Sequence, residues 1–263
     1  MIDFVRKNAY GIKDLVEIVA ILRMPGGCPW DREQTHATLR RGLLEEAYEV
    51  IEAIEEDNPA HLQEELGDVL LQVVFHAQIE QERGAFDLDA VCDTICKKLI
   101  FRHPHVFGDT AVDDTAEVLA NWDELKKQEK GQQTVSESME AVARSLPALW
   151  RAEKVQGKAA KVGFDWHEPQ GALDKLGEEL DELKVAMAGG DSAEIQEELG
   201  DLLFTAVNLS RKLGVDPEQA LTCATDKFQD RFAYAEAQAD MSLKELDAAG
   251  WDKLWEQAKR ESY

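Results

Sequence analysis

The fold is decided by the stretch that runs from Leu44-Glu45-Glu46-Ala47-Tyr48-Glu49 to Glu64-Glu65-Leu66-Gly67-Asp68, because the chain repeats it. The second copy runs from Gly177-Glu178-Glu179-Leu180-Asp181-Glu182 to Glu197-Glu198-Leu199-Gly200-Asp201. Glu46 and Glu65 are 19 positions apart, and so are Glu179 and Glu198. Two similar segments with an equal interval indicate an internal duplication, so we expect two related units in the chain.

Each copy predicts a pair of helices that carries four acidic residues. Residues three positions apart lie on the same face of a helix, and each predicted helix carries one such acidic pair. The pairs are Glu46 with Glu49 and Glu65 with Asp68 in the first copy, and Glu179 with Glu182 and Glu198 with Asp201 in the second. The second helix of each copy is apolar almost all round, which is typical of a buried helix.

These four carboxylates predict a metal site in each copy. Carboxylates that face one another at a buried helix repel each other and lose hydration unless a cation lies among them. Carboxylate oxygens are hard ligands, and no His or Cys occurs at matching positions, so the metal is expected to be Mg²⁺ first and Mn²⁺ second. A solvated acidic face would explain one such helix, but the duplicated quartet favours the metal.

The composition excludes some partners. The net charge is −24 and the sequence pI is about 4.6, so no excess of Lys and Arg is available for polymeric nucleic acid or an anionic membrane. Residues 1–23 mix charged with apolar side chains and predict neither a signal peptide nor a membrane span. Without a Cys-x-x-Cys pair, the cysteines are expected to be reduced core thiols of a cytoplasmic protein. They are Cys28, Cys92, Cys96 and Cys223.

Helical periodicity without strand alternation predicts an all-α fold with two tandem helical units. The acidic helix pairs are expected over 39–56 with 61–83 and over 172–188 with 192–213. The predicted organisation is an N-terminal helical domain over 1–131, a helical linker over 132–161 and a C-terminal helical domain over 162–263.

A basic pair follows each acidic quartet. Lys98 and Arg102 are four positions apart, as are Lys227 and Arg231, so each pair shares a helix face. A phosphate chain that bridges a metal and the protein would require such a pair, although an ordinary surface ion pair is the alternative. Trp122 and Trp255 occupy matching positions and could either stack on a base or anchor the core.

The continuation of the two basic helices differs. Arg102 is followed by His103-Pro104-His105, and the proline is expected to end the helix. Lys227 to Phe232 contains no proline, so the second helix is expected to continue. We therefore expect the basic pair of the second copy to be held more firmly.

These motifs, in this order and spacing, resemble the MazG family of nucleoside triphosphate pyrophosphohydrolases. The likeness covers nearly the whole chain. Beyond the acidic motifs it includes Gly27-Cys28-Pro29-Trp30-Asp31, Arg102-His103-Pro104-His105-Val106-Phe107, Val162-Gly163-Phe164-Asp165-Trp166 and Lys227-Phe228-x-x-Arg231-Phe232. The resemblance implies an all-α fold whose units pair as a homodimer. It also implies Mg²⁺-dependent hydrolysis of nucleoside triphosphates to the monophosphate and pyrophosphate, a house-cleaning activity on the nucleotide pool.

The resemblance also assigns roles to single residues. The implied metal ligands are Glu179, Glu182, Glu198 and Asp201, with Glu46, Glu49, Glu65 and Asp68 in the first copy. The implied nucleotide-binding residues are Lys175, Glu178, Lys227, Arg231 and Trp255, with Lys98, Arg102 and Trp122 in the first copy. The catalytic set comprises the four ligands of the second copy and Glu178, which could accept the proton of the attacking water. The C-terminal copy is the usual catalyst in two-domain relatives, but both quartets are complete here.

A non-catalytic acidic helical scaffold, such as a nucleic-acid mimic, is the competing hypothesis. Such a protein would use its negative charge to occupy a basic partner. This hypothesis explains the net charge of −24. It leaves the repeated basic pairs and the equal spacing of the quartets unexplained.

Overall fold

The computed structural model describes residues 4–109, 133–239 and 241–261, together with Asp114, Val118, Trp122, Leu125 and Glu129. The chain divides into two compact units, Met1–Lys126 and Lys127–Tyr263. Every regular element of the described residues is a helix, which confirms the all-α fold class. The boundary expected between residues 131 and 132 falls outside the described residues.

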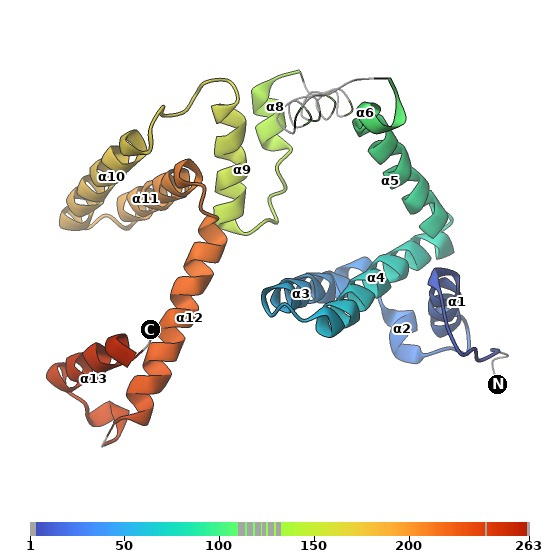
Figure 1. Ribbon diagram of the computed structural model, residues 1–263, viewed down its shortest axis with the longest axis horizontal. Helices are drawn as coiled ribbons and strands as arrows, with labels where there is room; N and C mark the ends of the chain where they lie inside the picture. The colour runs from blue at the N-terminus through green and yellow to red at the C-terminus, as the bar shows by residue number, and fades with distance from the viewer. Residues whose placement is uncertain are drawn as a thin grey trace. The chain divides into compact units, whose positions relative to one another are not determined.

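The first unit is built around a helical hairpin of α3 (His36–Glu55) and α4 (Pro59–Glu82). The elements α1 (Ile12–Arg23) and α2 (Pro29–Glu33) precede the hairpin, and α1 packs against both α2 and α4 (Figure 1). The helix α5 (Leu88–Arg102) follows and contacts α4. Because α3 carries the first acidic segment and α4 carries the second, the two acidic segments of the first copy lie on adjacent helices.

Capping residues determine where the hairpin helices begin. The side chain of Thr35 accepts a hydrogen bond from the N–H of Thr38 and caps α3. Asn58 Oδ1 accepts from the N–H groups of Ala60 and His61, at 3.2 and 3.3 Å, and caps α4. Both helices therefore begin a few residues earlier than the apolar periodicity predicted.

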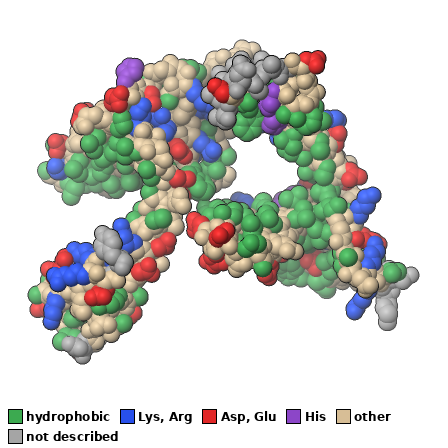
Figure 2. Space-filling view, viewed as in Figure 1, with side chains coloured by type: hydrophobic (Ala, Val, Ile, Leu, Met, Phe, Trp, Pro, Cys, Tyr) green, Lys and Arg blue, Asp and Glu red, His purple; other side chains and the backbone are tan. Residues whose placement is uncertain are grey.

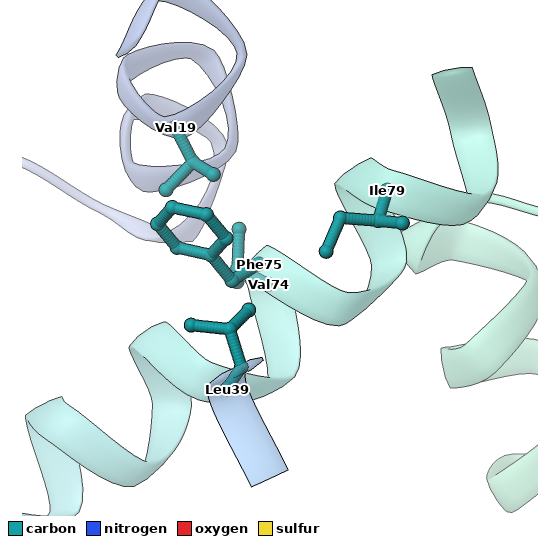
Figure 3. Close-up of a cluster of buried hydrophobic side chains, with 5 residues drawn as sticks. All are labelled: Val19, Leu39, Val74, Phe75 and Ile79. Carbon is teal, nitrogen blue, oxygen red and sulfur yellow. The ribbon is translucent and has the colours of Figure 1, made fainter. Parts of the chain in front are cut away.

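The core of the first unit lies where α1, α3 and α4 meet. Its buried side chains are Val19, Leu39, Val74, Phe75 and Ile79. Figure 3 shows the Phe75 ring lying against Val19 of α1. The Arg23 guanidinium lies 5.6 Å from the centre of the Phe75 ring and donates two hydrogen bonds, both 2.9 Å, to Glu82. These contacts attach α1 to the C-terminal half of α4.

The second unit repeats the hairpin with α10 (Pro169–Gly189) and α11 (Ser192–Leu213). Gly190, with a φ of 78°, ends α10 in the left-handed conformation that glycine adopts readily. The helix α9 (Ala148–Ala160) packs against α11, and α8 (Val135–Glu140) packs against α9. The duplicated hairpin predicted from the acidic segments is therefore present in both units.

Beyond the second hairpin, α12 (Pro217–Ala237) contacts α9 and α11, and α13 (Ala248–Glu261) packs back on α12 (Figure 1). A short 3₁₀ turn, η1 (Leu243–Glu245), lies between them. The Trp150 indole N–H of α9 donates to Asp216 Oδ1 at 3.0 Å, which fixes the start of α12.

The helices that carry the basic pairs differ as predicted. The helix α5 ends at Arg102, and α6 (Pro104–Phe107) begins after His103, whose φ and ψ of −123° and 57° are not helical. In contrast, α12 continues without interruption through Lys227 and Arg231.

Two predictions about burial are wrong for the single chain. Cys92, Cys96 and Cys223 are exposed and Cys28 is partly exposed, so the free thiols are not core residues. The apolar helices are also only partly buried, because a two-helix hairpin covers one side of each helix. Leu66 on α4 remains 51% exposed and Leu203 on α11 remains 53% exposed. Figure 2 shows hydrophobic side chains at the surface of both hairpins.

Among the described helices, none combines the length and the apolar character required to cross a lipid bilayer.

Candidate metal and nucleotide site

Each hairpin brings together three of its four predicted metal ligands. Glu179 and Glu182 lie one turn apart on α10, and Glu198 of α11 faces them. Each of the three carboxylates offers an oxygen that lies within 4.8 Å of the other two. The first hairpin forms the same triplet with Glu46, Glu49 and Glu65. The equal spacing in the sequence thus corresponds to equal clusters in space.

The fourth carboxylate of each quartet lies beside its cluster. Loss of hydration raises the pKa of Glu198, and the negative charges of Glu182 and Asp201 raise it further. In the first unit, loss of hydration also raises the pKa of Glu46, with further contributions from its hydrogen bond to Glu49 and the charge of Asp68. The aspartates are therefore within electrostatic reach of the triplets.

The donor set of both clusters fits a hard divalent cation. A raised carboxyl pKa means that the chain does not fully compensate the negative charge of the group. Burial and the neighbouring Glu49 raise the pKa of Glu65 in the same way. Three convergent carboxylates that offer only oxygen atoms suit Mg²⁺ or Mn²⁺ better than softer metals.

Lys175 contacts the second cluster directly. Its Nζ lies 2.7 Å from Glu178 Oε1 and 3.0 Å from Glu179 Oε1. Hydrogen bonds to Glu178 and Glu179 raise the pKa of Lys175 above its ordinary value. This lysine, predicted to bind the nucleotide, is therefore already placed next to one of the predicted metal ligands.

The first cluster has a different basic neighbour. The position that matches Lys175 is Gly42, which offers no side chain. Instead, His61 Nδ1 lies 2.8 Å from Glu56 Oε2 and its Nε2 lies 3.3 Å from Glu65 Oε1. The two clusters therefore share their carboxylates but differ in the basic side chain that the chain places beside them.

Among the described residues of the second unit, the basic pair lies apart from the acidic cluster. Asp201 lies twelve residues before the end of α11, which is about 18 Å along the helix. Lys227 lies ten residues into α12, or about 15 Å beyond its start. Figure 1 shows α12 leading away from the hairpin. The second unit therefore does not bring Lys227 and Arg231 to its own acidic cluster.

The two matching tryptophans lie beside the basic helices. Trp255 of α13 packs against Phe228 of α12, with ring centroids 5.2 Å apart and planes inclined at 49°. In the first unit, Trp122 lies beside His103 at the end of α5, with ring centroids 6.4 Å apart. Trp255 therefore packs on the helix that carries Lys227 and Arg231, and Trp122 lies beside the end of the helix that carries Arg102.

The second unit also contains a cavity that the sequence did not predict. It has a volume of about 580 Å³ and lies between α9, α11 and the loop before α10. The residues that characterise it are Gln156, Phe164, Trp166, Phe204 and Asn208. One sequence signal could have suggested part of this wall, because Phe204 and Asn208 follow Asp201 at helical spacing and share its face.

Ion pairs hold the loop before α10 against α11. Arg211 donates two hydrogen bonds to Asp165, at 2.6 and 3.0 Å, and Lys212 Nζ lies 3.3 Å from the same carboxylate. The bonds from Arg211 hold the pKa of Asp165 below its ordinary value. Lys212 also donates to the carbonyl oxygen of Trp166 at 2.6 Å. These contacts place Trp166 against the cavity.

Comparison with known proteins agrees with this duplicated arrangement. The family model of the MazG nucleotide pyrophosphohydrolase domain matches residues 34–107 and 167–234. These ranges include the two acidic clusters and the two basic pairs.

Three relatives extend the likeness along the chain. The chain is 50% identical over 250 residues to the nucleoside triphosphate pyrophosphohydrolase/pyrophosphatase MazG of Thermotoga maritima, covering 94% of this chain and 95% of the relative. It is 44% identical over 256 residues to the nucleoside triphosphate pyrophosphohydrolase of Escherichia coli K12, covering 95% and 97%. It is also 45% identical over 251 residues to the uncharacterised protein YabN of Bacillus subtilis, covering 92% of this chain and 50% of YabN. The chain therefore belongs to the MazG family of nucleotide pyrophosphohydrolases, with two copies of the family domain.

Proposed function

We propose that this chain hydrolyses nucleoside triphosphates to the monophosphate and pyrophosphate with Mg²⁺, which Mn²⁺ can replace. The observation that carries the proposal is the convergence of Glu179, Glu182 and Glu198, whose oxygens lie within 4.8 Å of one another. The names of the relatives from Thermotoga maritima and Escherichia coli support the substrate class. The activity would remove unwanted nucleotides from the cellular pool.

The carboxylates of the second unit would act as one binding group. A divalent cation bound there would neutralise phosphate oxygens and lower the pKa of a water molecule. Glu179 and Glu182 from α10, with Glu198 and Asp201 from α11, would hold it between the two helices. Glu178 is exposed and hydrogen-bonded to Lys175, so it is available to accept the proton of the attacking water.

The basic residues would bind the nucleotide in a homodimer. Lys227 and Arg231 would stabilise the departing pyrophosphate, and Trp255 lies on the helix packed beside them. Because α12 leads away from its own hairpin, we place the basic pair of one chain beside the acidic cluster of a second chain. Lys98, Arg102 and Trp122 would have the corresponding role in the first unit. Exposed apolar side chains on both hairpins support such a pairing.

The same proposal places the protein in the cytoplasm, with neither a nucleic-acid polymer nor a membrane as partner. The net charge of −24 supports the absence of polyanionic partners. The four free cysteines support a reducing compartment.

The direct test is to measure the products released from ATP with Mg²⁺, with Mn²⁺ and with a chelator. We expect metal-dependent release of pyrophosphate and AMP. Calorimetry should show saturable Mg²⁺ binding that Glu198→Gln removes, whereas Glu197→Gln, which alters a neighbouring carboxylate outside the triplet, should retain it. Release of single phosphates without pyrophosphate would contradict the reaction. An absence of saturable metal binding would instead favour the acidic scaffold.

A further inference from the structure

We infer, on the basis of the proposed function, that the cavity beside α11 holds the base of the nucleotide and recognises an N–H donor of that base through Gln156. The cavity has a volume of about 580 Å³, within the range of roughly 300–1,000 Å³ that is common for small-molecule sites. Its walls are mostly apolar and carry a small number of polar groups, which is also typical of such sites.

Gln156 offers the cavity a fixed hydrogen-bond acceptor. Only 5% of the residue is exposed, and its Nε2 donates to the carbonyl oxygen of Phe204 at 2.7 Å. Its Oε1 is buried and has no hydrogen-bond partner among the described residues. The bond to Phe204 fixes the orientation of the amide and uses one of its two N–H groups, and it leaves the Oε1 acceptor unpaired. A buried acceptor without a donor is unfavourable, so a ligand N–H group would satisfy it.

Aromatic side chains supply the walls. Phe164 is 81% exposed, Phe204 is 45% exposed and Trp166 is 38% exposed, although all three lie around one cavity. Aromatic faces bind nucleobases by stacking, with little dependence on the identity of the base. A planar heterocycle that donates an N–H group therefore matches both the walls and the single fixed acceptor.

The position of the cavity relative to the carboxylates suits a nucleotide. Asp201, Phe204 and Asn208 follow one another along one face of α11. Asn208 lies seven residues beyond Asp201, or about 10 Å along the helix. A nucleotide whose phosphates lie at the acidic cluster can therefore reach the cavity with its base through the ribose.

The first unit carries a buried aromatic side chain at the position that matches Asn208. Phe75 matches Asn208, since these residues are separated by the same interval as Asp68 and Asp201. Phe75 is only 4% exposed, and its ring packs against Val19 of α1 in the buried core (Figure 3). The two units therefore share their acidic clusters, but the position that carries a buried aromatic ring in the first unit lines a cavity in the second.

The first experiment introduces the aromatic side chain of the first unit at the matching position of the second unit. Asn208→Phe should raise the KM for ATP by roughly 10- to 100-fold, the loss expected when a base no longer stacks. Maximal turnover should change little, because base binding is lost equally from the ground state and the transition state. Asn208→Ala, which removes the amide without filling the cavity, should have a smaller effect. Inorganic tripolyphosphate, which has no base, should inhibit both variants as strongly as it inhibits the unaltered protein.

The second experiment changes the ligand, so it does not depend on the folding of a variant. An analogue of ATP whose 6-amino group carries two methyl groups cannot donate to Gln156. Its KM on the unaltered protein should exceed that of ATP by roughly fivefold to tenfold, the loss expected for one hydrogen bond. Gln156→Met should raise the KM for ATP and remove the difference between the two nucleotides.

These measurements separate failure of the cavity assignment from failure of the proposed function. If ATP is hydrolysed but Asn208→Phe leaves its KM unchanged, the cavity is not the base site. If this variant keeps its KM but its molecular mass in light scattering differs from that of the unaltered protein, the cavity instead binds a side chain of a second copy of the chain. If no triphosphate is hydrolysed, calorimetry can still measure binding of the non-hydrolysable α,β-methylene analogue of ATP. Weaker binding of this analogue to the Asn208→Phe variant than to the unaltered protein would support the cavity as the base site. Equal binding to both proteins would overturn the assignment.

Discussion

Glu179, Glu182 and Glu198 form a cluster of like charges on two helices. Loss of hydration is the largest reason why the pKa of Glu198 lies above its ordinary value, and the repulsion between these carboxylates raises it further. In the protein without metal this arrangement opposes folding, because ionised groups at short distance repel one another. The proposed metal binding therefore requires a cluster of carboxylates whose mutual repulsion lowers the stability of the metal-free fold.

Glu182→Gln should abolish hydrolysis and leave the melting temperature of the metal-free protein unchanged or slightly raised. The substitution removes one metal ligand and also one of the repelling charges. Product release and thermal unfolding in the presence of a chelator measure both effects. Asp181→Asn is the matched control, because Asp181 is 77% exposed and lies outside the cluster. A large fall in the melting temperature would indicate that Glu182 has a structural role instead.

Asp165→Asn should destabilise the second unit by about 1.5–3 kcal/mol at pH 7, the contribution typical of hydrogen bonds to a charged group. Asp165 accepts two hydrogen bonds from Arg211, and 15% of its side chain is exposed. Because these bonds lower its pKa below 3.8, the carboxylate stabilises the fold above that pH. That stability is lost as the pH falls through the lower pKa of the folded state.

Denaturant unfolding of both proteins at pH 7 and near pH 2.5 tests this dependence. The difference in the free energy of unfolding should shrink at the lower pH. An equal difference at both pH values would show that the stabilisation comes from packing and not from the charge of Asp165.

At the scale of secondary structure, the units differ in the helix that follows the hairpin. Lys227 and Arg231 lie one turn apart on the uninterrupted α12. Arg102 is the last residue of α5, and the chain leaves the helical conformation at His103. A cation inside a continuous helix is better positioned before the reaction than one at a helix end. The matching positions Phe75, which is buried in the core, and Asn208, which lines the cavity, differ between the copies in the same sense.

The second unit should therefore carry most of the activity. Asp201→Asn should remove nearly all hydrolysis, whereas Asp68→Asn should retain more than half, on the same panel of nucleoside triphosphates. The two variants remove the same charge at matching positions, so each is the control for the other. If Asp68→Asn removes nearly all hydrolysis and Asp201→Asn leaves it unchanged, the first unit is the enzyme.

On the scale of the whole molecule, the hairpins leave apolar side chains uncovered. Leu199 is 45% exposed and Leu203 is 53% exposed, one turn apart on α11. Contiguous exposed apolar surface is typical of a protein interface. The face that carries these leucines belongs to the hairpin that also carries the acidic cluster. Pairing of two chains would thus bury it and stabilise the hairpin.

The unaltered protein should have twice the chain mass of 29.5 kDa in light scattering. Replacing both Leu199 and Leu203 with lysine should reduce the mass to that of one chain, because buried unpaired charges oppose association. Gln81→Lys, which adds one such charge at an exposed polar position, should leave the mass unchanged. A monomeric unaltered protein would contradict the proposed homodimer.

Local sequence patterns were sufficient to predict the all-α class, the duplicated hairpin and six of the carboxylates that converge. These features depend on local quantities, since residues three or four apart share a helix face wherever that helix lies. The proline after Arg102 determined the helix break for the same reason. The first residues of the helices were predicted less well, because caps such as Asn58 act through single hydrogen bonds.

Tertiary packing determines which groups from distant segments meet. It placed Asp68 and Asp201 beside the clusters and left one face of α11 exposed. It also formed the cavity, in which Gln156 donates to a carbonyl oxygen 48 positions away. Periodicity specifies the faces of a helix but not the helix that will pack on each face. Whether Phe75 becomes core and Asn208 lines a cavity therefore depends on the packing of α1 and α9, which no local pattern encodes.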